Sequence, residues 1–88
     1  MKKGKTETGF TYALDETVFD DMELLEMLVS IDKGEASELP AVVEKLLGAE
    51  QKKRLYEHCR DANGRVPVSR VGAEIAAIFT AFDRTKKS

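Results

Sequence analysis

The most apolar stretch of the chain, Val18–Ile31 (VFDDMELLEMLVSI), limits the possible folds more than any other segment. Apolar side chains recur there at helical spacing and cover about half of the helix surface, wider than the roughly 100° stripe of an ordinary surface helix. The predicted stripe consists of Val18, Met22, Leu25 and Val29, flanked by Leu24, Leu28 and Ile31. In so short a chain the other apolar segments must pack against this helix, with Leu25 central to the core.

The length of 88 residues indicates a single domain. We expect this domain at residues 9–83, between flexible basic tails at 1–8 and 84–88. One cysteine excludes an internal disulfide and suits a reducing cytoplasm. No apolar run approaches the roughly 18 residues that span a bilayer, and no apolar core follows the charged N-terminus as a signal peptide requires.

The remaining pattern predicts an all-α fold, a small bundle of about four helices with a short extended N-terminal segment. Phe10, Tyr12 and Leu14 alternate with small residues, which favours the extended segment. Gly34 and Gly48 are expected to end helices. The predicted helices are 17–33, 39–47, 49–62 and 69–83.

The loop CRDANGRVPVSR at 59–70 has the outline of a calcium-binding EF-hand. Placing Gly64 at the sixth position puts Cys59 at the first and Arg70 at the twelfth. Both essential carboxylates are then missing, so calcium is not expected to bind. We expect Gly64 to make the turn, and Val66 and Val68 to pack on the core.

No residue pattern predicts an enzyme, a metal site or a cofactor. His58 and Cys59 are adjacent, about 100° apart on a helix, and the chain has no second histidine or cysteine to share a metal. The carboxylates near Asp20 and Glu26 occupy the polar side of an amphipathic helix, where solvation is their usual role. No glycine-rich phosphate loop is present.

The net charge of −2 is unevenly distributed. Residues 9–48 hold ten acidic and two basic side chains, a balance of −8, whereas residues 49–88 hold five and nine, a balance of +4. The two halves either neutralise each other or form a dipolar surface that joins copies head to tail. In the second arrangement the candidate protein-binding residues are Lys52, Lys53, Arg54, Asp20, Asp21 and Glu23.

A small DNA-binding or transcriptional regulator is the main alternative. The phosphate patch would then consist of Lys52, Lys53, Arg54, Arg60, Arg65 and Arg70. The pI near 5.4 and the acidic half both disfavour contact with nucleic acid. The segment Val66–Val68 also lengthens the connection beyond a tight helix-turn-helix turn.

Four segments together resemble the tail assembly chaperones of long-tailed phages and prophages of Gram-positive bacteria. They are FDDMELLEML at 19–28, LLG at 46–48, LYEHCRDANGRVPV at 55–68 and IF at 78–79. The resemblance covers roughly residues 10–80. It implies a compact helical fold and a non-enzymatic role, in which the chaperone coats the tape-measure protein and helps recruit major tail protein subunits.

The resemblance also implies a location in the host bacterial cytoplasm and absence from the mature virion. A structural component that stays in the tail is the alternative within the same setting. Related chaperones are often made in two forms through a ribosomal frameshift. The tandem codons of Lys86 and Lys87 are a candidate slippery site for such a frameshift. Alternatively, these lysines belong to a basic tail that aids solubility. Self-association remains open.

Overall fold

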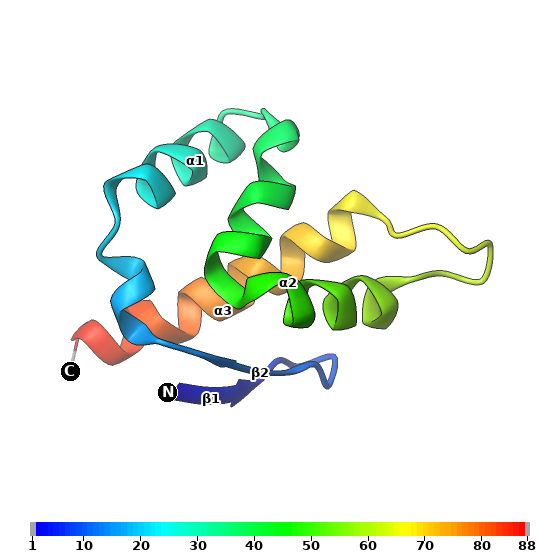
Figure 1. Ribbon diagram of the computed structural model, residues 1–88, viewed down its shortest axis with the longest axis horizontal. Coiled ribbons are helices and arrows are strands. Elements are labelled where there is room, and N and C mark those ends of the chain that lie inside the picture. The colour runs from blue at the N-terminus through cyan, green and yellow to red at the C-terminus, as the bar shows by residue number, and fades with distance from the viewer. Residues whose placement is uncertain (1, 88) are drawn as a thin grey trace.

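The computed structural model describes the backbone of residues 2–87 and the side chains of residues 2–81 (Figure 1). In chain order its elements are the strands β1 (Lys2–Lys5) and β2 (Thr11–Leu14), the 3-10 helix η1 (Glu16–Phe19), the helix α1 (Met22–Asp32), the 3-10 helix η2 (Ala36–Glu38), and the helices α2 (Leu39–Cys59) and α3 (Val68–Lys87). The described chain is mostly helical, as predicted. The all-α prediction is wrong, because β1 and β2 form an antiparallel sheet.

The predicted second and third helices form one element, α2, so the described chain contains three α-helices and not four. Gly48 lies inside α2 with φ 84° and ψ 164°, a backbone conformation that is not helical. Glycine adopts positive φ because it has no Cβ. Gly48 therefore bends α2 instead of separating two helices, and Figure 1 shows the two halves running in different directions.

The N-terminal residues form half of a β-hairpin, because Lys2–Lys5 of the tail predicted at 1–8 form β1. Tyr12 and Leu14 of β2 are buried, which confirms the alternation expected for this segment. Gly4 pairs with Tyr12 across the sheet, and a Cβ on Gly4 would collide with the Tyr12 ring. Sheet pairing thus orders a segment that hydropathy alone does not place.

The two edges of the hairpin differ. Gln51 of α2 covers the β2 edge: its Oε1 accepts from Ala13 N at 2.7 Å, and its Nε2 donates to Ala13 O at 2.6 Å. Backbone groups of alternate residues point to opposite sides of an antiparallel pair. The backbone N–H and C=O of Ala13 point toward α2. Those of its cross-strand partner Lys3, and of Lys5 two residues further on, therefore point away from β2. The outer edge of β1 is unpaired within the described chain.

Helix α1 starts later than predicted and buries a different face. Asp15 is the N-cap of η1 and Asp21 is the N-cap of α1, so the predicted single helix is divided into two separate helices. The buried side of α1 is centred on Leu24, with Met27, Leu28 and Ile31 partly buried. Leu25 is 53% exposed and Val29 is 47% exposed, so the prediction of Leu25 at the core centre is wrong.

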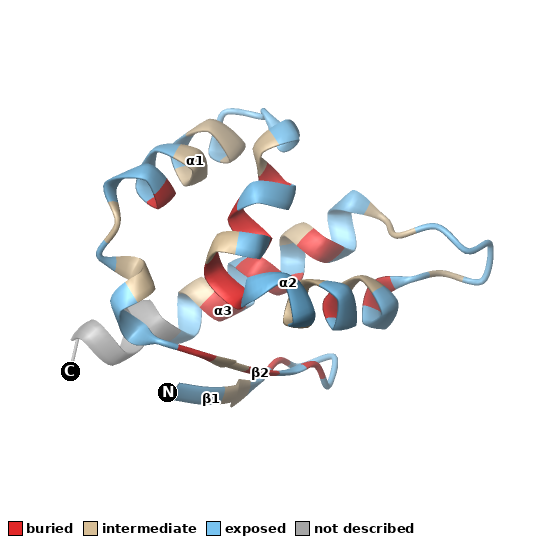
Figure 2. Cartoon of the chain, in the orientation of Figure 1, coloured by how far each residue is buried: buried red, intermediate tan, exposed pale blue. Residues whose placement is uncertain are grey.

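The core is organised around α2 rather than α1. α2 contacts α1, α3, β2 and both 3-10 helices, and Figure 2 shows buried residues along both of its halves. Its buried side chains are Leu39, Val42, Val43, Leu46, Leu47, Leu55 and Cys59. α3 adds Val71, Ile75 and Ile78, and the hairpin adds Phe10, Tyr12 and Leu14.

The connection between α2 and α3 is organised by its own polar groups. The Asp61 carboxylate accepts from the backbone of Asn63 and Arg65 at 2.9 and 3.0 Å. Gly64 has φ 82°, as a turn residue should, but Val68 is 60% exposed, so its predicted packing on the core is wrong. The backbone of α3 continues through most of the tail predicted at 84–88. The side chains of Lys86 and Lys87 lie outside the described part.

Candidate protein-binding groove

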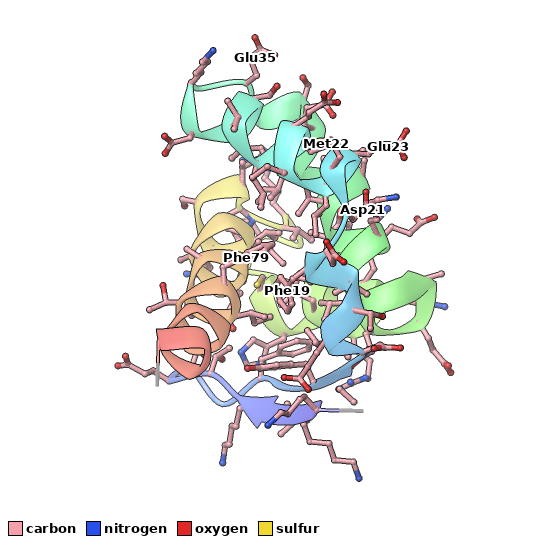
Figure 3. All side chains as sticks on the ribbon, turned by 90° about the vertical axis from the view of Figure 1, so that its left-hand side faces the viewer. Phe19, Asp21, Met22, Glu23, Glu35 and Phe79 are labelled. Atoms are coloured by element: carbon pink, nitrogen blue, oxygen red, sulfur yellow. The ribbon has the colours of Figure 1, made fainter. Side chains whose placement is uncertain are left out.

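The predicted acidic site residues lie where η1 ends and α1 begins: Asp20 follows η1, Asp21 precedes α1 and Glu23 is in its first turn, and Figure 3 labels Asp21 and Glu23. Asp21 caps α1 by accepting from the backbone of Glu23 and Leu24. Its carboxylate also pairs with Lys45 of α2 at 3.1 Å, and this contact lowers the pKa of Asp21 and raises that of Lys45. Asp21 therefore fastens α1 to α2, and only the neighbouring exposed carboxylates remain available to a partner.

The predicted basic site residues are mostly engaged within the molecule. Lys52 pairs with Glu44 at 3.1 Å. Arg54 donates to Thr11 O at 3.2 Å and lies over the Phe10 ring. Lys53 is exposed and forms no ion pair with a described residue. The three cations are not one free patch, and reversing all of them would disturb the packing of the hairpin.

An apolar groove of about 560 Å³ lies between α1 and α3. The α1 side is formed by Leu28, Val29 and Ile31. Ile75 and Phe79 line the α3 side, and Leu39, Asp32 and Lys33 complete the end near η2. Among the described residues the two helices make few contacts with each other, because α1 packs against α2 and η2, and α3 packs against α2. The groove is thus a consequence of how the three helices are arranged.

The exposed face of α1 extends this groove along the whole helix. Met22 is 68% exposed, and it shares one face with Leu25 and Val29 at the spacing i, i+3, i+7. Val29 lines the groove itself. Large exposed apolar side chains are unremarkable when scattered, but a contiguous row beside an apolar groove marks an interaction surface. Sequence periodicity found these residues and assigned them to the core.

Small residues form part of the α3 side. Gly72, Ala76 and Thr80 line the groove at intervals of four residues, so they lie on one face of α3. A Cβ on Gly72 would meet no heavy atom within 4 Å. The backbone of another helix could therefore approach α3 closely along this line.

Aromatic packing joins η1 to the same side of α3. The rings of Phe19 and Phe79 pack edge to face, with centroids 5.1 Å apart. Figure 3, which views the molecule from the C-terminal end of α3, labels both residues near the centre of the view. This contact connects η1 to the helix that forms one side of the groove.

Comparison of the chain with known protein families, curated proteins and solved structures gives no match.

A buried carboxylate on α3 holds the hairpin turn in place. Glu74 is 5% exposed, and its two oxygens accept from the hydroxyls of Thr6 and Thr8, each at 2.7 Å. The Thr8 oxygen also lies 2.9 Å from Nε2 of His58. Since Thr8 gives its only proton to Glu74, its oxygen accepts from His58. The sequence prediction missed Glu74, although its position three residues after Val71 on the buried face was an available signal.

The Cys59 thiol beside this cluster is not activated as a nucleophile. Nε2 of the neighbouring His58 contacts the Thr8 hydroxyl. Burial raises the pKa of the Cys59 thiol, and the nearby Glu74 carboxylate raises it further. Both effects disfavour the thiolate that a reactive cysteine requires.

A second hollow of about 740 Å³ lies beside the hairpin. Its charged lining residues are Glu50, Glu57, Lys53 and Arg54. Two acidic and two basic side chains give it no preference for ligands of one charge. Across the described residues, no three histidine, cysteine or acidic side chains lie close enough to hold a metal ion. No helix in that part of the chain is long and apolar enough to cross a bilayer.

Proposed function

We propose that this protein is a non-enzymatic phage tail assembly chaperone that binds the tape-measure protein and helps recruit tail-tube subunits. The choice of the tape-measure protein as the partner comes from the resemblance of the sequence to tail assembly chaperones. The groove between α1 and α3 is the observation that carries the mode of binding, because it is open, apolar and bordered by exposed apolar side chains. Grooves of this kind accept the apolar face of an amphipathic helix.

The proposal assigns the exposed row of α1 a function that folding alone does not explain. Val29, Leu25 and Met22 gain little from the fold, since about half or more of each side chain stays in contact with water. Covering them with a partner would remove apolar surface from water, at about 25 cal/mol for each Å². An aggregation-prone partner would in turn have its own apolar helices covered.

Co-expression with the tape-measure protein encoded in the same genome tests this function. The wild-type protein should keep the tape-measure protein soluble and co-purify with it. Ala76→Arg places a long charged side chain in the groove and should abolish both effects. Ala77→Arg is the matched control, because Ala77 is exposed on α3 but does not line the groove. If the wild-type protein neither binds nor solubilises the tape-measure protein, the proposal is wrong.

The DNA-binding alternative has less support from the surface. Several side chains of its phosphate patch have partners within the molecule: Lys52 pairs with Glu44, Arg60 with Glu57, and Arg70 donates to Cys59 O. A phosphate would have to displace these contacts. The acidic surface around α1 would also repel DNA.

A further inference from the structure

We infer that the groove recognises a basic amphipathic helix of about three turns, with lysine or arginine on both sides of its apolar stripe. This inference rests on the proposed function and adds the chemistry by which the partner segment is selected. It follows from three features of the groove: the charge around it, the positions of the acidic side chains on α1, and its length.

The surroundings of the groove are strongly acidic. Residues 15–38, which include η1, α1 and η2, hold nine acidic side chains and one basic side chain, a balance of −8. Lys45 of α2 neutralises part of this charge by pairing with Asp21 and, at 3.7 Å, with Glu23. Glu26 and Asp32 are exposed and form no ion pair with any described residue. A basic partner would supply the missing counter-charges.

Two of the unpaired carboxylates, Glu26 and Asp32, flank the exposed apolar row. Successive residues of a helix advance by about 100°, so Glu26 falls on one side of the row and Asp32 on the other. Asp32 and Lys33 both line the groove, so its described lining is neutral and the acidic excess lies on the exposed residues around it. A helix lying in the groove would therefore have basic side chains on both borders of its apolar face.

The length of α1 sets the length of the bound segment. Its 11 residues span about 16 Å, or three turns, at a rise of 1.5 Å for each residue. A partner helix of this length presents apolar residues at i, i+3 or i+4, and i+7. Close approach along Gly72 and Ala76 favours small or flat side chains at the middle contact.

The test uses three synthetic peptides of about 18 residues, long enough to form a helix on binding. The first has leucines at helical spacing flanked by lysines, the second has the same leucines flanked by glutamates, and the third is a scrambled form of the first. Fluorescence anisotropy should show the lysine peptide binding at least about tenfold more tightly than either of the others. Ala76→Arg should abolish this binding, and Ala77→Arg should not.

Charge reversal on the protein gives the converse result. The double variant Glu26→Lys/Asp32→Lys should lose the lysine peptide and gain the glutamate peptide. The control Glu7→Lys/Glu50→Lys changes the net charge equally at exposed residues outside the groove, and it should bind like the wild type.

Four results would overturn the inference: equal binding of the lysine and glutamate peptides, tight binding of the scrambled peptide, no binding of any peptide, or a self-assembled dimer that Ala76→Arg dissociates. The last would show that a second copy covers the groove. If the tape-measure protein is still solubilised in such a case, the proposed function stands and the basic-helix inference fails.

Discussion

Leu24 and Leu25 are adjacent in the sequence and lie in opposite environments. Leu24 is 1% exposed, whereas Leu25 is 53% exposed. The apolar residues of this segment cover so much of the helix surface that helical spacing fits more than one buried face. Packing against α2 selects the face that contains Leu24, Met27, Leu28 and Ile31. Periodicity predicted a helix in this segment, although α1 starts at Met22 rather than at residue 17. It could not choose the buried side, because that choice depends on the partner element.

The two leucines allow a direct test. Leu24→Ala should lower the free energy of unfolding by about 2–5 kcal/mol, as for other large-to-small core changes. Leu25→Ala should change it by only about 0.5 kcal/mol, as for surface positions, while weakening tape-measure binding. Urea unfolding of both variants measures the first effect. Equal losses for the two variants would show that the exposed row of α1 is part of the core.

At the level of elements, α1 is held to the core by the side chains centred on Leu24 and by Asp21 at its start. Asp21 serves twice, as the N-cap of α1 and as the partner of Lys45. The sequence indicated acidic residues in this region but not which of two adjacent aspartates has a structural role. The distinction arises from the position of Lys45 on another helix, which local sequence does not encode.

Asp21→Asn should keep the helix cap, because asparagine caps as well as aspartate, and should remove the ion pair. The folded state lowers the pKa of Asp21 below its ordinary value of 3.8. The stabilisation is therefore fully present above that value and is lost as the pH falls through the lower folded pKa. Thermal unfolding should show the variant less stable at neutral pH and equal to the wild type in acid.

Asp20→Asn is the matched control, since Asp20 is exposed and forms no ion pair with a described residue. Its stability should follow that of the wild type at each pH. A pH-independent difference between Asp21→Asn and the wild type would mean that the contact with Lys45 contributes no stability.

For the whole molecule, the bend at Gly48 decides which elements α2 can reach. The half before the bend packs with α1, and the half after it supplies Gln51 and Arg54 to the hairpin. The sequence predicted an interruption at Gly48, the extended segment and the helical regions. It did not predict β1 or the groove, because strand pairing and the spacing of α1 and α3 depend on residues far apart in the chain.

Two glycine substitutions should have effects of opposite sign. Gly48 occupies a backbone region accessible essentially only to glycine, so Gly48→Ala should cost about 1–3 kcal/mol. Gly72 lies in a regular helix with open space at its Cβ position. Gly72→Ala should therefore stabilise the protein by about 0.5–1 kcal/mol. Chemical denaturation measures both. If Gly48→Ala were stabilising, α2 would be straight in solution.

If many copies bind one tape-measure protein, as proposed, the unpaired outer edge of β1 becomes important. At such local concentrations, the free backbone groups at Lys3 and Lys5 could pair with the same edge of a second copy. The lysines of β1 oppose this pairing, because a second identical strand would bring like charges into register. The sheet should therefore stop at two strands, and crowding on the partner would remain reversible.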